Sequence, residues 1–196
     1  MTALPVILGI SGASGAAIGL RVAELLNAAA VPVELIVTRG AERTLAEEIG
    51  PDALARLGEL AALHHPIDDL GATVASGSYP VAGMIVAPCS MRSLGAIAHS
   101  LSDNLLVRAA DVQLKQRRRL VLIARESPLH LGHLRAMCAV TEMGAIVAPP
   151  VPAFYLRPSN CADIIDQIAR RSVDLLGVLA PLARRWDGGG AGTPKG

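Results

Sequence analysis

The chain has 196 residues, a length that suits one domain with a good core and is short for two. Its 52% of apolar residues include only one Trp, two Tyr and one Phe, so the core is built from Ala, Val, Leu and Ile, as in a parallel sheet covered by helices. A net charge of +1 gives no case for nucleic acid, and no apolar run reaches the roughly 18 residues of a membrane span. No charged and apolar leader precedes Pro5, so we expect a cytoplasmic protein without a membrane or nucleic-acid partner.

Short apolar runs alternate with helical patterns along the chain. Strands are expected at residues 5–10, 33–38, 83–88, 119–124 and 145–149. Helices are expected at residues 16–30, 41–49 with the segment that follows, 91–98, 129–143 and 163–179, with a basic helix-like stretch from Arg108 and an irregular segment at 64–78. This order predicts an α/β fold, a Rossmann-like three-layer α/β/α arrangement with a doubly wound, mainly parallel sheet. Residues 1–186 then form a single domain, and 187–196 a flexible Gly-rich tail.

The metal-ligating residue types show no matching spacing. Three cysteines, Cys89, Cys138 and Cys161, are far apart and odd in number, which favours reduced thiols. His130 and His133 are three apart but have no Cys or carboxylate ligands at a suitable distance along the chain. We expect no metal site.

Two turns of small residues follow predicted strands and lead into predicted helices. The first covers residues 11–15 and the second residues 88–93. A helix N-terminus offers free backbone N–H groups and a positive dipole to a phosphate, so two such turns favour one phosphorylated ligand. The first is not a GxGxxG motif, and a plain tight turn capped by Ser14 is the alternative.

Charged residues also follow strands. Arg125 and Glu126 come directly after the fourth strand, where open α/β sheets bind their ligands, although a strand meeting solvent explains them equally well. Lys115, Tyr155 and Arg171 are the donors that a second phosphate or carboxylate requires, provided that the fold brings them together.

The ordered motifs resemble the UbiX-type flavin prenyltransferases, formerly called aromatic acid decarboxylase subunits, from about residue 5 to 186. The matching segments are Ser11-Gly12-Ala13-Ser14-Gly15-Ala16, Ala75-Ser76-Gly77-Ser78, Ala87-Pro88-Cys89-Ser90-Met91, Asp103-Asn104-Leu105-Leu106, Arg108-Ala109-Ala110-Asp111-Val112, Leu120-Val121-Leu122 with Arg125-Glu126, and Pro152-Ala153-Phe154-Tyr155. Flavoprotein decarboxylases that act on peptidyl cysteine share the fold and the FMN site, but their signatures differ.

The resemblance implies transfer of a dimethylallyl group from dimethylallyl phosphate to N5 and then C6 of reduced FMN, without a metal. The prenylated FMN would serve a partner decarboxylase of the UbiD type. The resemblance also implies an assembly built from trimers, a homododecamer, with FMN pockets between subunits. A mean hydropathy of +0.44 without a membrane segment favours self-association independently.

The family pattern also implies roles for individual residues. Its FMN positions fall at Gly12, Ala13, Ser14, Thr38, Ser90, Met91, Arg92, Ser93 and Arg125. Its prenyl-phosphate positions fall at Lys115, Tyr155 and Arg171, with Arg125 shared between both ligands. Glu126, or the released phosphate, would accept the proton from C6, and Ser14 and Glu48 match positions near N5. Glu126, Ser14, Glu48 and Lys115 are therefore the expected catalytic residues.

The chain departs from the family pattern at a few positions. The family often has Lys or Gly followed by Thr where this chain has Arg92 and Ser93; Ser93 keeps a hydroxyl, and Arg92 is expected to alter the flavin-phosphate contact. Some members have a tryptophan before the Ser-Gly-Ser turn, where this chain has only Leu70 and no aromatic residue, although Trp186 matches a C-terminal family tryptophan.

Two further functions stay open at this point. One is a protein that binds or delivers FMN or prenylated FMN without catalysis, against which Lys115, Glu126, Tyr155 and Arg171 argue, because a carrier needs no prenyl-phosphate pocket. The other is an FMN-dependent decarboxylase of a small acid.

Overall fold

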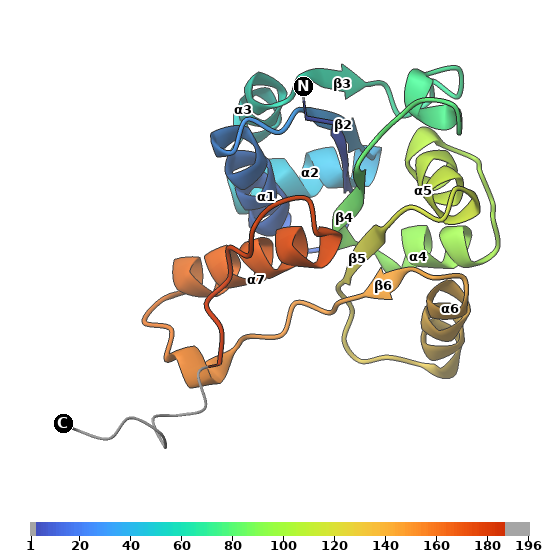
Figure 1. Ribbon diagram of the computed structural model, residues 1–196. Helices are drawn as coiled ribbons and strands as arrows, with labels where there is room; N and C mark the ends of the chain where they lie inside the picture. Colours follow the sequence, from blue (N-terminus) through green and yellow to red (C-terminus); the bar gives the residue numbers. More distant parts are fainter. Residues whose placement is uncertain (1–2, 187–196) are drawn as a thin grey trace.

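The computed structural model describes residues 3–186 and shows one parallel six-stranded sheet, with the strand order β3-β2-β1-β4-β5-β6 (Figure 1). The strands are β1 (Val6–Ile10), β2 (Val33–Val37), β3 (Leu63–His65), β4 (Gly83–Cys89), β5 (Leu120–Ala124) and β6 (Ile146–Val147). All residues of β1, β2, β4 and β5 are buried, as expected for strands that are covered on both faces.

Helices cover both faces of the sheet and confirm the predicted three layers. The helices are α1 (Ala16–Ala28), α2 (Arg39–Glu48), α3 (Ala53–Leu60), α4 (Met91–Ala98), α5 (Leu105–Lys115), α6 (Leu131–Glu142) and α7 (Cys161–Leu176), with short 3-10 helices η1 (Thr73–Ala75) and η2 (Phe154–Leu156). One apolar core lies under α1, α2, α3 and α7, and the other under α4, α5 and α6 (Figure 1). None of the helices in residues 3–186 has the length and apolar character needed to cross a membrane.

The order in which strands are added to the sheet reverses between β1 and β4. From β1 the chain continues outward to β2 and β3, whereas β4 leads to β5 and β6 on the other side. In doubly wound sheets, ligands bind outside the carboxyl ends of the strands at this switch point. The turns after Ile10 and Cys89 therefore lie side by side, where a phosphorylated ligand was expected.

The structure corrects the prediction for the segment 64–78. This segment was expected to be irregular, but it opens on the edge strand β3, in which His64 pairs with Leu35 of β2, and it includes η1. Three residues, two of them histidines, give no alternating pattern, so pairing with β2 alone defines the strand. Glu34 of β2 supports it, because its buried carboxylate lies 2.6 Å from His65 Nε2 and also accepts a hydrogen bond from the Tyr79 hydroxyl.

Other boundaries differ by a few residues. The terminal helix α7 begins two residues earlier and ends three residues earlier than the expected 163–179, so Arg171 lies in its second half. Asn160 accepts a hydrogen bond from Asp163 N at its start, and Gly177, with φ of 74°, ends it. The expected tail at 187–196 lies outside the described residues.

Candidate active site

A cavity of about 400 Å³ lies at the carboxyl ends of β1, β2 and β4. Its walls come from the turn after β1 and from the starts of α2, α4 and α5, together with the segment after β3. The lining residues are Gly12, Thr38, Arg39, Gly40, Ile67, Asp68, Ser90, Arg92, Ser93, Asp103 and Asn104. Five of the nine residues expected to contact FMN, namely Gly12, Thr38, Ser90, Arg92 and Ser93, therefore share one cavity.

Ser11 joins the two small-residue turns. Its hydroxyl donates to the carbonyl of Pro88 over 3.1 Å and accepts from the backbone N–H of Ser90 over 2.7 Å. Ser11 is fully buried. It was not among the expected site residues, although a polar residue directly after a buried strand is a signal that points to such a role.

Gly12 leaves room for the backbone of α2. A Cβ atom at Gly12 would lie 2.9 Å from the carbonyl carbon of Gly40 and 3.0 Å from its Cα. These are backbone atoms, so they cannot turn aside as a flexible side chain would. The turn after β1 and the start of α2 meet this closely only because position 12 has no side chain.

Side-chain oxygens cap the three helices that begin at the cavity. The hydroxyl of Ser90 accepts from Ser93 N over 3.2 Å, that of Thr38 from Ala41 N over 3.2 Å, and the amide oxygen of Asn104 from Val107 N over 3.1 Å. Three helix N-termini thus direct their positive dipole ends toward one cavity, which suits an anionic ligand.

The cavity has two cations and two carboxylates, and each cation is paired. Arg39 Nη2 lies 2.7 Å from Asp68 Oδ2, and Arg92 Nη2 lies 2.5 Å from Asp103 Oδ2. All four side chains are more than half exposed. Of these four residues, the sequence predicted only Arg92 as part of the site.

Glu48 binds the chain directly after Ser14. Its Oε2 accepts hydrogen bonds from the backbone N–H groups of Gly15 and Ala16, both over 2.9 Å, at the start of α1. Ser14 makes no cap, because Gly15 is the N-cap residue and has φ of 106°. The predicted cap by Ser14 is therefore wrong, and the carboxylate that caps α1 comes from the far end of α2.

We expect Glu48→Ala to destabilise the protein by about 1 kcal/mol, because two N–H groups at a helix N-terminus lose their acceptor. The melting temperature should fall by roughly 2–4 °C in thermal unfolding monitored by circular dichroism. Glu47→Ala is the control, since Glu47 is exposed and pairs only with Arg43 one turn away. Equal melting temperatures for Glu48→Ala and the control would contradict the capping role.

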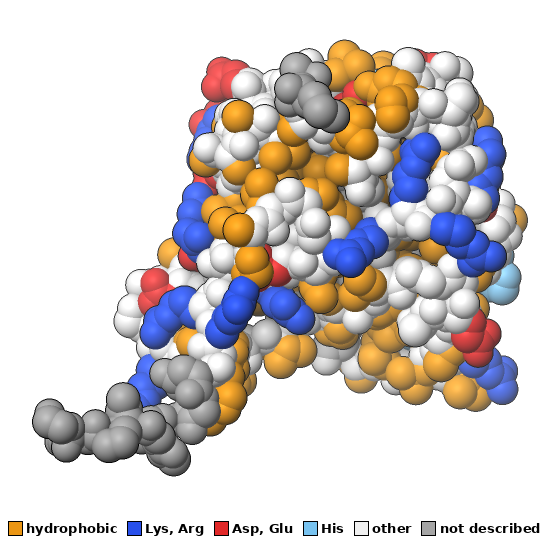
Figure 2. All heavy atoms as spheres, viewed as in Figure 1, with side chains coloured by type: hydrophobic (Ala, Val, Ile, Leu, Met, Phe, Trp, Pro, Cys, Tyr) orange, Lys and Arg blue, Asp and Glu red, His pale blue; other side chains and the backbone are white. Residues whose placement is uncertain are grey.

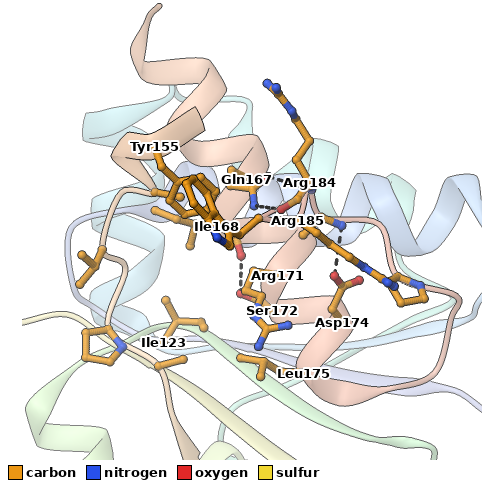
Figure 3. Close-up of a pocket in the computed structure, with 17 residues that line it drawn as sticks. Ile123, Tyr155, Gln167, Ile168, Arg171, Ser172, Asp174, Leu175, Arg184 and Arg185 are labelled. Atoms are coloured by element: carbon orange, nitrogen blue, oxygen red, sulfur yellow. Dashed lines mark hydrogen bonds between the residues drawn. The ribbon is translucent and has the colours of Figure 1, made fainter. Parts of the chain in front are cut away.

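A second cavity, of about 540 Å³, lies between α7, the segment 148–155 and the segment 181–186 (Figure 3). Tyr155 from η2 and Arg171 from α7 both line it. The ring of Trp186 packs edge-on against Tyr155 with the centroids 5.4 Å apart. Two of the predicted prenyl-phosphate residues and the C-terminal tryptophan are thus brought together.

Two side chains of α7 hold the chain after it against this cavity. The carboxylate of Asp174 accepts from the backbone N–H groups of Leu182 and Ala183 over 2.6 and 3.1 Å. The Gln167 amide accepts from Arg184 N over 3.3 Å and donates to its carbonyl over 3.2 Å (Figure 3). Arg184, Arg185 and Trp186 therefore line the cavity, and of these the sequence singled out only Trp186.

Other expected site residues lie in neither cavity. Arg125 and Glu126 are exposed directly after β5, where Arg125 N donates to the carbonyl of Cys89 over 3.0 Å, next to Ser90. Lys115 is the exposed last residue of α5, toward the amino end of β5, far from the carboxyl ends of the strands in the fold. A single chain does not bring Lys115 to Tyr155 and Arg171.

Two more of the expected FMN positions, and the place of the family tryptophan, line neither cavity. Ala13 and Met91 are buried, and Met91 belongs to the apolar core under α4, α5 and α6. Leu70, at the place of the family tryptophan, is half exposed and lines neither cavity.

The cysteines are free, as expected from their spacing. Burial raises the pKa of the Cys89 thiol to about 12, so it is a neutral packing group beside the site rather than a nucleophile. Within residues 3–186, no three His, Cys, Asp or Glu side chains gather closely enough to hold a metal ion.

The parallel sheet, with a cavity at its switch point surrounded by helix N-termini, defines a nucleotide- or flavin-binding α/β protein. A model of the Flavoprotein family matches residues 1–171. The flavin prenyltransferase UbiX of Thauera aromatica is 49% identical over 93% of this chain and 94% of its own length.

Solved structures give the same result. A crystal structure of AnUbiX (PadA1) in complex with FMN and dimethylallyl pyrophosphate has a TM-score of 0.88 at 41% identity, over 95% of this chain and 98% of that one. A dodecameric FMN-dependent UbiX-like decarboxylase from Escherichia coli O157:H7 has a TM-score of 0.89 at 40% identity, over 94% of this chain and 100% of that one. The chain belongs to the Flavoprotein family and, within it, to the UbiX flavin prenyltransferases.

Proposed function

We propose that this protein transfers a dimethylallyl group from dimethylallyl phosphate to N5 and C6 of reduced FMN. The observation that carries the proposal is the cavity at the switch point, where the expected flavin residues Gly12, Thr38, Ser90, Arg92 and Ser93 come together. The relative that is 49% identical is a flavin prenyltransferase, and a similar structure binds FMN and dimethylallyl pyrophosphate. Neither open alternative, a flavin carrier or a decarboxylase, has a feature of its own in the described residues that favours it.

Each cavity has a chemical task in this reaction. Ser90, Ser93 and Arg92 at the start of α4 suit the flavin phosphate, since hydroxyl, backbone and guanidinium donors bind such an anion. Bound there, reduced FMN would supply an electron-rich ring as the nucleophile. Tyr155 and Arg171 suit the leaving phosphate, whose negative charge grows as the C–O bond breaks. Glu126 accepts the proton that leaves C6. Ser14 and Glu48 act as the acid–base groups that exchange the proton at N5.

The two cavities share no lining residue, so we infer that the complete site forms between subunits. Large apolar side chains are exposed in the single chain, among them Leu131 and Leu134 on α6 and Phe154 beside Tyr155. Figure 2 shows such apolar side chains at the surface between Lys and Arg side chains. One similar structure is dodecameric. Association would bring Lys115 and Arg125 of one copy toward the prenyl-phosphate residues of another.

We therefore expect a closed assembly built from trimers, a homododecamer. Light scattering at micromolar concentration should report a mass of many subunits, because burying the exposed apolar side chains favours association. A stable monomer would contradict both the assembly and the shared site.

The product leaves for another enzyme in this proposal. Prenylated FMN is a modified cofactor, and we propose a UbiD-type decarboxylase as its recipient. The function is tested by the flavin spectrum of the purified protein, which should change when dimethylallyl phosphate is added under reducing conditions. A flavin spectrum that dimethylallyl phosphate leaves unchanged would favour a carrier.

We expect Arg171→Ala to separate the two ligands. Loss of one charge-assisted phosphate contact costs about 1.5–3 kcal/mol, roughly ten- to a hundredfold in the requirement for dimethylallyl phosphate or in turnover. FMN affinity should stay within a few fold, because Arg171 lies outside the flavin cavity. Ser90→Ala should do the reverse: it should lower the affinity for FMN and leave the requirement for dimethylallyl phosphate unchanged. Loss of FMN binding in Arg171→Ala, with an unchanged response to dimethylallyl phosphate, would remove Arg171 from its assigned role.

A further inference from the structure

The side chains around the flavin cavity have no net charge, although its proposed ligand is a phosphate. Its two cations, Arg39 and Arg92, are matched by two carboxylates, Asp68 and Asp103. A site that only had to hold a phosphate tightly would leave the guanidinium groups free, because charge-assisted bonds to phosphate are the strong ones. The carboxylates lower the attraction of this cavity for anions.

Asp103 is fixed more firmly than an ordinary surface carboxylate. Its Oδ2 lies 2.5 Å from Arg92 Nη2, and its Oδ1 accepts from the side-chain amide of Asn104 over 2.9 Å. Asn104 is in turn the N-cap of α5, where its oxygen accepts from Val107 N. The start of α5 thus holds a negative charge against the guanidinium at the start of α4.

Arg92 can exchange this partner for a phosphate. Its guanidinium has five N–H donors, and a single hydrogen bond, to Asp103, engages it among the described residues. The pair is more than half exposed, and such pairs are worth only about 0.2–1 kcal/mol. A phosphate with a charge near −2 binds the same donors more strongly than a single exposed carboxylate does.

We propose that Asp103 is a positioning residue that competes with the flavin phosphate for Arg92 and thereby weakens flavin binding. This inference rests on the proposed function, in which the flavin is a substrate that must leave as product. Flavin phosphate displaces Asp103 from Arg92 on binding, and Asp103 takes Arg92 back on release. The ligand class is a flavin 5′-phosphate, and riboflavin, which has no phosphate, is indifferent to the pair.

The test is a double-mutant cycle on the full-length protein, with the affinity for oxidised FMN and for riboflavin measured by flavin fluorescence. Asp103→Asn keeps the shape and the contact with Asn104 but removes the charge. It should bind FMN roughly two- to fivefold more tightly, with a smaller gain at high salt, and bind riboflavin as the wild type does. Arg92→Ala should lower the affinity for FMN roughly ten- to a hundredfold and leave the affinity for riboflavin unchanged.

The double variant decides the mechanism. If Asp103 acts through Arg92, Asp103→Asn should raise the affinity for FMN by less than about twofold in the Arg92→Ala background. Glu47→Gln on α2, outside the cavity, controls for the change in total charge and should leave both affinities unchanged.

Three results would overturn the inference: weaker FMN binding by Asp103→Asn, an equal gain in the Arg92→Ala background, or an equal gain in Glu47→Gln. The first would mean that Asp103 orients Arg92 for phosphate, and the second that it repels phosphate directly. Failure of the proposed function appears differently, as a wild-type protein that binds no FMN or forms no prenylated flavin.

Discussion

Glu126→Gln is expected to keep FMN binding and to stop the reaction before the four-ring product. The amide preserves the shape of the side chain but cannot accept the proton from C6, a step worth roughly a hundredfold or more in rate. Glu126 is exposed directly after β5, and its Oε1 accepts only from the neighbouring Ser127 N over 3.1 Å, so its other oxygen is available to a ligand.

The measurement is mass spectrometry of the flavin after turnover. Glu142→Gln, an exposed carboxylate on α6, is the control and should yield the mature product as the wild type does. Wild-type yield from Glu126→Gln would remove Glu126 from its role, and a slow but complete reaction would identify the released phosphate as the main base.

Gly12→Ala is expected to lower FMN affinity by more than about tenfold. The added Cβ would lie 2.9 Å from the carbonyl carbon of Gly40, so the turn after β1 and the start of α2 must move apart, and both line the flavin cavity. Backbone shifts of this kind commonly cost about 1–3 kcal/mol. Here they lower the affinity for FMN, because the segments that move line the cavity that binds it.

Gly58→Ala is the matched control, because a Cβ at Gly58, on α3, meets no atom within 4 Å. It should bind FMN normally and be slightly more stable, since alanine favours helix over glycine. Fluorescence titration measures both variants. Wild-type affinity in Gly12→Ala would show that the ligand does not use this turn.

The fold could be predicted from the sequence because its central strands β1, β4 and β5 are buried and apolar throughout. Patterns such as Val6–Ile10 and Leu120–Ala124 identify central parallel strands without any help from neighbours. The short edge strand Leu63–His65 could not be predicted, since only its pairing with β2 defines it. Its partner Glu34 is a buried carboxylate that no periodicity explains.

The candidate site was predictable where a residue follows a strand. Gly12, Thr38 and Ser90 all lie at carboxyl ends, and the parallel sheet places these ends together. Residues supplied by later loops were missed, because Asp68 and Asp103 reach the cavity only through the path of the folded chain. Lys115 lies away from Tyr155 and Arg171 because of the direction in which α5 runs. The spacing of these residues in the sequence could not predict this separation.

Formation of a prenylated flavin by this chain can be measured in a single reaction. The purified protein is given reduced FMN and dimethylallyl phosphate without oxygen, and the flavin is analysed by mass spectrometry. The flavin should gain the mass of one dimethylallyl unit, joined at N5 and C6, and only when both ligands and the protein are present. Recovery of FMN that is bound but unchanged would contradict the proposed prenyl transfer and leave a carrier as the better description.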